Sequence, residues 1–184
     1  MTKIHDSENP SQIPQTFEEA VLMIQEFALI EVKKEVEKKQ LYFHNYAHAK
    51  AVKTQGRNHF LMLLNLFWGS KFVDEPALAD SQRVKYLIDI CAASHDIVQE
   101  FLPTTTPKTA RQRESGVSET ATINKLINYI KQLNQEFIHQ NPELPPLFNE
   151  SDFQIIKKTI SATICLFDTS DNSIYQPDLY NLEQ

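Results

Sequence analysis

The stretch Tyr42-Phe43-His44-Asn45-Tyr46-Ala47-His48-Ala49-Lys50-Ala51-Val52 places two histidines four residues apart, immediately before a helix-like run. Because an α-helix has about 3.6 residues per turn, His44 and His48 can project from the same face. A second signal lies downstream in Ala92-Ala93-Ser94-His95-Asp96, where an apolar run ends in a histidine–aspartate pair. Together the two stretches predict a helical protein with a metal site and a nearby proton donor.

The rest of the chain has the pattern of long helices separated by short breaks. Apolar spacing predicts helices over 17–39, from the histidine stretch to Trp68, over 78–98, over 115–139 and over 152–167. Thr16 and Ser151 each begin a capping-box sequence, and residues 168–184 look irregular. No segment has the alternation of a strand. We therefore expect an all-α fold: a flexible leader over 1–14, then a single-domain bundle of five or more helices over 15–184.

The composition is that of an ordinary globular protein. The 184 residues are 41% hydrophobic and 23% charged, enough to build one domain with its own core. Only three glycines are present, which argues against glycine-rich phosphate loops. The net charge of −6 is mildly acidic, and nonspecific nucleic-acid binding usually needs a basic face, so we expect no nucleic-acid polymer as a partner. Without a signal peptide or a run of about 18 apolar residues, the chain is expected to be cytoplasmic and free of the membrane.

The two cysteines, Cys91 and Cys165, both lie in apolar, helix-like runs. Such positions favour two reduced thiols in the core of a cytosolic protein over a disulfide or a metal role.

Metal binding is the interpretation that best explains the polar residues at the end of the third helix. Neutral imidazole is a ligand for zinc, iron, manganese or nickel, and a carboxylate adds affinity for harder cations. A single histidine on an apolar face is usually a hydrogen-bonded core residue. Asp96, however, is costly to bury after an apolar helix unless it is paired or bound to metal. On an undisturbed helix His95 and Asp96 would point about 100° apart, and both could face an ion lying between their directions.

These residues carry a family resemblance. His48 followed by His95-Asp96 resembles the HD-domain phosphohydrolase pattern of a histidine, a His-Asp pair and a distant aspartate. His44-Asn45-x-x-His48-Ala49-x-x-Val52 is also similar to the signature of the cyclic-nucleotide phosphodiesterase branch of that superfamily. The resemblance covers roughly residues 40–165. It implies an HD-domain-like bundle and a metal-dependent hydrolase acting on a nucleotide or another small phosphate ester.

The resemblance also implies a role for each matching residue. His48, His95 and Asp96 would bind a divalent metal ion (Mn, Fe, Zn, Ni or Mg), and Asp96 could bridge a second ion. His44 would be the general acid that protonates the leaving oxygen, and Asn45 would orient that region. A water activated by the metal would attack phosphorus.

The final aspartate of the family pattern has no clear match. Asp168, Asp171 and Asp178 are the candidates, and Asp178 in Gln176-Pro177-Asp178-Leu179 resembles the motif most. Pro177 and the lack of a following apolar helix depart from the pattern. Either Asp178 is the fourth metal ligand, or that ligand lies beyond residue 184 in a C-terminal helix that this sequence lacks.

A basic group follows the His-Asp pair within the connection 100–113. Lys108, Arg111 and Arg113 could clamp a substrate phosphate, or they could belong to a solvated loop whose charge Glu114 and Glu119 balance. Glu114 falls near a position where related HD proteins place a carboxylate at the edge of the site.

Three functional hypotheses follow. The first is the phosphohydrolase. The alternative is a catalytically silent HD-like protein that binds a nucleotide or a protein partner for regulation. The third is a helical interaction module in which His44 and His48 make only structural hydrogen bonds. A homodimer is compatible with all three.

Overall fold

The computed structural model describes residues 13–41, 45–55, 75–103, 111–171 and 173–177. They form the helices α1 (Phe17–Lys39), α3 (Glu75–Ser94), α4 (Val117–Gln140) and α5 (Glu150–Ser161). Residues 46–55 form a further helical segment. A small antiparallel hairpin pairs β1 (Leu166–Asp168) with β2 (Ser173–Tyr175). The predicted all-α architecture is confirmed.

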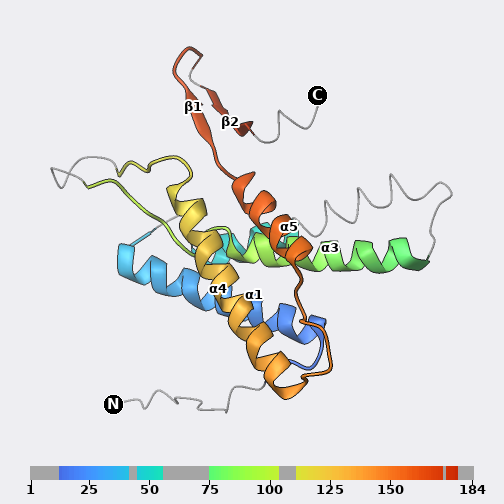
Figure 1. Ribbon diagram of the computed structural model, residues 1–184. Helices are drawn as coiled ribbons and strands as arrows, with labels where there is room; N and C mark the ends of the chain where they lie inside the picture. Colours follow the sequence, from blue (N-terminus) through green and yellow to red (C-terminus); the bar gives the residue numbers. More distant parts are fainter. Residues whose placement is uncertain (1–12, 42–44, 56–74, 104–110, 172, 178–184) are drawn as a thin grey trace, which may run out of the picture.

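The four long helices pack around one apolar core (Figure 1). Helix α1 contacts α3 and α4, and α5 contacts the same two helices. The side chains fully or almost fully buried between them include Ile24, Ala28, Val32, Leu87, Ile90, Leu126, Ile130, Phe148, Ile156 and Ile160. The C-terminal ends of α1 and α3 both lie next to the candidate site, at Lys39 and Ser94.

Helix α1 begins and ends with side-chain and backbone caps. The Thr16 hydroxyl accepts a hydrogen bond from the Glu19 N–H (3.2 Å), and the Glu19 carboxylate accepts one from the Gln15 N–H (2.7 Å). The predicted start is therefore confirmed. At the other end Gln40 adopts the left-handed conformation (φ 52°), and its N–H bonds to the Val36 carbonyl. This αL cap ends the helix.

Helix α3 ends at Ser94, so the prediction that it continues to Val98 was wrong. The His95 N–H still bonds to the Cys91 carbonyl (2.9 Å), and the Ile97 N–H then bonds to Ser94 (3.1 Å) in a tight turn. The chain leaves this turn as an extended segment. Consequently His95 and Asp96 lie in a turn after the helix.

Polar side chains of α4 hold the extended segment that follows. The Ser118 hydroxyl accepts from the Glu100 N–H (2.9 Å), and the Thr122 hydroxyl accepts from the Val98 N–H (3.2 Å). Ser118 and Thr122 are both buried. They satisfy backbone N–H groups that a longer α3 would have paired within the helix.

Helix α5 begins earlier than predicted, because Asn149 is its cap and not Ser151. The Asn149 side chain accepts from the Asp152 N–H (3.1 Å), while the Asp152 carboxylate accepts from the Asn149 N–H (2.7 Å). The helix also ends earlier, at Ser161. Beyond it the Thr163 hydroxyl donates to the Ile160 carbonyl (2.7 Å), a local bond that competes with further helix.

The hairpin spans the end of the predicted helix 152–167 and the start of the segment 168–184 predicted to be irregular, so the expectation of no strand was wrong. Phe167 pairs with Ile174, and both side chains are exposed. The sequence pattern alone predicts the apolar run up to Phe167 to be the end of the fifth helix. Asp168 closes the turn by accepting from the N–H (2.8 Å) and the hydroxyl (2.6 Å) of Ser170. These two bonds lower the pKa of Asp168 below its usual value. The hairpin extends away from the helices (Figure 1).

Parts of two other predictions fall outside the described residues: most of the leader and the apolar helix from Phe60 to Trp68. Among the described residues, no helix combines the length and the apolar character needed to cross a membrane.

One ion pair ties α5 to the rest of the bundle. Arg83 on α3 donates to the buried Asp152 carboxylate through Nε (2.8 Å) and Nη2 (2.5 Å), and also to the Leu147 carbonyl (2.8 Å). Its guanidinium lies 4.0 Å from the centre of the Phe17 ring on α1. One side chain therefore links α1, α3 and the N-terminus of α5.

We expect Arg83→Met to lower the free energy of unfolding by about 3 kcal/mol, because it leaves the buried Asp152 carboxylate without its cation. Urea denaturation followed by circular dichroism measures this change. Gln82→Met, at the exposed neighbouring position on α3, is the matched control. Equal stability of the two variants would contradict a structural role for the ion pair.

The cysteines differ in environment. Cys91 is buried in the core, and burial raises the pKa of its thiol to about 12. Cys165 is exposed between α5 and β1, so the expectation of two core thiols holds for Cys91 alone. Both are free.

At pH 8 iodoacetamide is expected to modify Cys165 in the native protein and to leave Cys91 intact, because a buried, protonated thiol is a poor nucleophile. Peptide mass spectrometry identifies the modified residue. Alkylation of both residues after denaturation in urea is the control. Modification of native Cys91 at the rate of Cys165 would contradict the assignment.

Candidate metal centre

Asn45 sets the position of His48 by capping the helical segment 46–55. Its side-chain oxygen accepts a hydrogen bond from the His48 N–H (3.0 Å), and its carbonyl accepts from the Ala49 N–H (3.0 Å). Ala49 is fully buried, which presses this segment against the bundle. His48 therefore lies in the first turn of a capped helix, with its backbone held by Asn45.

The turn after α3 brings His95 and Asp96 to His48. One carboxylate oxygen of Asp96, Oδ2, lies 3.0 Å from Nε2 of His95 and 3.4 Å from Nε2 of His48. One ligand atom from each of the three residues lies within 4.8 Å of the others. Two imidazoles and a carboxylate, contributed by segments more than forty positions apart in the sequence, thus converge on one small volume.

These separations suit a common cation. Nitrogen and oxygen ligands that bind one ion at about 2.1 Å lie about 3.0 Å apart in octahedral geometry and about 3.4 Å apart in tetrahedral geometry. The two Nε2–Oδ2 separations, 3.0 and 3.4 Å, fall within this range, and the shorter one is also that of a direct hydrogen bond between His95 and Asp96. The mixture of imidazole and carboxylate ligands suits borderline divalent ions such as zinc, iron and manganese.

The orientation of His95 is set by its other ring nitrogen. Nδ1 lies 3.0 Å from the Ala92 carbonyl, which can only accept, so Nδ1 carries the proton and Nε2 faces Asp96. Burial works to lower the pKa of His95, but the hydrogen bond and charge of Asp96 and the Ala92 carbonyl outweigh it and raise the pKa above its usual value. A cation between Nε2 and the carboxylate would replace the proton there.

Exposure shows which side of the cluster is open. The side chains of Asp96 and His95 are 8% and 15% exposed, whereas that of His48 is 40% exposed. The carboxylate therefore forms the floor of the cluster, and the His48 side is accessible to solvent and to a ligand.

Asp96 also contacts a buried residue, Gln99, that no sequence motif identifies. The Gln99 amide donates from Nε2 to the other carboxylate oxygen of Asp96, Oδ1 (2.6 Å), and its Oε1 accepts from Arg113 Nη1. Gln99 is 1% exposed. A single glutamine has no motif that would identify it, and only the turn after α3 places it beside Asp96.

The predicted basic group separates into different environments. Arg113 is exposed and reaches the cluster through Gln99. Arg111 donates to the Lys39 carbonyl, and its guanidinium lies 5.4 Å from the centre of the Phe101 ring. Lys108 lies outside the described residues.

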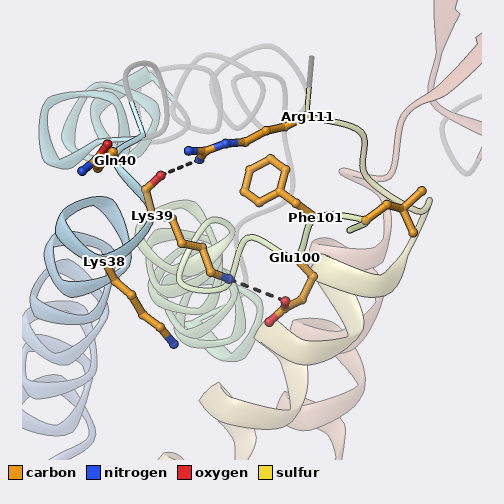
Figure 2. Close-up of a pocket in the computed structure, with 7 residues that line it drawn as sticks. Lys38, Lys39, Gln40, Glu100, Phe101 and Arg111 are labelled. Atoms are coloured by element: carbon orange, nitrogen blue, oxygen red, sulfur yellow. Dashed lines mark hydrogen bonds and ion pairs between the residues drawn. The ribbon is translucent and has the colours of Figure 1, made fainter. Parts of the chain in front are cut away.

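Arg111 lines a pocket of about 300 Å³ at the C-terminal end of α1 (Figure 2). Figure 2 shows Lys39 between this arginine and Glu100, to which its ammonium is paired at 3.6 Å. The same ammonium pairs with Glu35 (2.7 Å). None of the three clustered residues lines this pocket. Arg111 therefore binds the C-terminal end of α1, and both interpretations of the basic group stay predictions.

The other predicted site residues contribute less. Glu114 is exposed, and its carbonyl accepts from the Val117 N–H (3.4 Å) before α4. Asp168 and Asp171 stabilise the hairpin turn and are not part of the cluster. His44 and Asp178 fall outside the described residues, so the general acid and the fourth ligand stay predictions.

We expect the purified protein to bind Mn²⁺, and His48→Ala and Asp96→Ala each to weaken binding more than about 100-fold, since loss of a ligand exceeds the 10- to 100-fold effect of an outer-shell change. Electron paramagnetic resonance of free Mn²⁺ measures the affinity. His139→Ala, at an exposed histidine near the end of α4, controls for loss of any histidine. Unchanged affinity in both cluster variants would refute the site.

No protein-family model, no curated protein and no solved structure matches this chain. The HD-domain resemblance therefore stays an interpretation of the sequence motif, and any functional proposal depends on the geometry of the cluster.

Proposed function

We propose that the protein is a metal-dependent phosphohydrolase that acts on a nucleotide or another small phosphate ester. The observation that supports the proposal best is the convergence of His48, His95 and Asp96, with their ligand atoms within 4.8 Å of one another. The same three residues form the HD-type motif in the sequence, so residue type, order and geometry favour one interpretation.

His48, His95 and Asp96 would hold the ion. A divalent cation there would polarise a phosphoryl oxygen and lower the pKa of a water molecule. Asp96 supplies the negative charge that makes the cluster attractive to a cation. His95, fixed by the Ala92 carbonyl, keeps Nε2 directed into the cluster.

Substrate would approach from the His48 side, which is the exposed side of the cluster. Hydrolysis breaks the bond between phosphorus and the leaving oxygen, and this oxygen must gain a proton. His44 is the predicted donor, as the resemblance to the phosphodiesterase signature implies. Arg113 is the predicted phosphate contact best supported by position, because its guanidinium is tied to Gln99 beside Asp96.

The activity is tested with Mn²⁺ and a panel containing p-nitrophenyl phosphate, bis-p-nitrophenyl phosphate and nucleoside mono-, di- and cyclic phosphates. We expect turnover of at least one substrate, with kcat/KM at least about 100-fold lower in His48→Ala and Asp96→Ala, equivalent to about 2.7 kcal/mol of transition-state stabilisation. Phosphate release and product chromatography are the measurements.

His139→Ala is again the control and is expected to retain full activity. Mn²⁺ binding without turnover of any substrate would contradict the hydrolase and support the catalytically silent regulatory protein. Turnover that persists in Asp96→Ala would show that a contaminant, or another site, is responsible.

A further inference from the structure

We propose that Gln99 and Arg113 form a positioning pair that fixes the Asp96 carboxylate for metal binding. The inference rests on the proposed metal site and extends it to two residues outside the His and Asp motif. The chain of contacts runs from the Arg113 guanidinium through the Gln99 amide to the Asp96 carboxylate.

Gln99 is held at all four of its polar groups. Its N–H donates to Glu35 Oε1 (2.8 Å), and its carbonyl accepts from Lys39 Nζ (2.6 Å). Its side-chain oxygen accepts from Arg113, and its side-chain nitrogen donates to Asp96. A residue that is 1% exposed and bonded at every end has no freedom to reorient.

The chemistry of the two outer groups sets the direction of the amide. A guanidinium has only donors, so it must face the amide oxygen of Gln99. The amide nitrogen then points at Asp96, whose carboxylate accepts. Without Arg113 the amide could flip, and its oxygen would face a carboxylate oxygen with no proton between them. Arg113 therefore acts on Asp96 through Gln99.

The two carboxylate oxygens of Asp96 therefore face different partners. Oδ1 accepts from Gln99 at 2.6 Å, while Oδ2 lies 3.0 and 3.4 Å from the two histidines. The hydrogen bond to Oδ1 holds the plane of the carboxylate and leaves Oδ2 directed toward the histidines. Outer-shell hydrogen bonds of this kind orient metal ligands and typically contribute 10- to 100-fold in metal affinity.

The base of the connection after Gln99 keeps Arg113 in reach. The Leu102 N–H bonds to the Gln112 carbonyl (2.8 Å), which pairs the two ends of this connection. Arg113 follows directly and turns back toward Gln99. An exposed arginine is thus supported by a backbone bond next to it, and its contact with a buried amide is built into the fold.

The test measures Mn²⁺ affinity by electron paramagnetic resonance in wild type, Gln99→Met, Arg113→Met and Arg113→Lys. Methionine fills a similar volume and has no amide. We expect affinity to fall about 10- to 100-fold in Gln99→Met and about 10-fold in Arg113→Met. Arg113→Lys should stay near wild type, because an ammonium can still donate to Gln99 Oε1.

Gln154→Met is the matched control, at an exposed glutamine of α5 that bonds to Glu150. Thermal unfolding without metal shows whether each variant is folded. If Gln99→Met fails to fold, the exposed Arg113 variants decide the question, since a general loss of stability would not be rescued selectively by lysine.

The outcomes separate the two proposals. Failure of wild type to bind Mn²⁺ would overturn the metal site and this inference with it. Binding by wild type that is lost in Asp96→Ala but unchanged in Gln99→Met and Arg113→Met would overturn the positioning pair alone. Equal weakening in Arg113→Met and Arg113→Lys would also overturn it, because lysine preserves the donor.

Discussion

The candidate site depends on one buried carboxylate. Asp96 lies at the bottom of the cluster, and its two oxygens interact with His48, His95 and Gln99. An ionised carboxylate in an apolar core is costly, so the fold must surround it with cations or donors. Three separate parts of the chain do this: the capped segment at His48, the turn at the end of α3 and the connection that carries Arg113.

The turn after α3 brings His95 and Asp96 into contact with each other and with His48. On a helix extended to Val98, the side chains of His95 and Asp96 would point about 100° apart. The chain instead leaves the helix, and its free N–H groups are taken up by Ser118 and Thr122 of α4. Two buried positions of α4 are therefore polar, where apolar contacts would be expected. Ser118 and Thr122 determine the path of the chain after α3 and do not themselves belong to the cluster.

The hydrogen bonds of Gln99 link the packing of the helices to the candidate site. Gln99 connects the candidate ligand Asp96 to the end of α1 through Glu35 and Lys39, and to the following connection through Arg113. The packing of α1 against α3 thus bears on the orientation of a carboxylate in the site. A change in that packing would reach the candidate ligands through hydrogen bonds rather than through the apolar core.

The sequence by itself determined the fold class and the helix from 17 to 39, because apolar periodicity and capping signals are local. The grouping of His48 with His95 and Asp96 was predicted from the resemblance to the HD-domain pattern, because residue spacing alone does not bring such distant positions together. It did not determine where α3 and α5 end, nor the hairpin. The end of α3 depends on Thr122 and Ser118, whose hydroxyls bond to backbone N–H groups of the chain after the helix. The region after α5 depends on strand pairing, in which Phe167 pairs with Ile174. Only the tertiary structure decided that Gln99 contacts Asp96, since a hydrogen bond between side chains depends on the path of the turn and on Arg113, which approaches from beyond it.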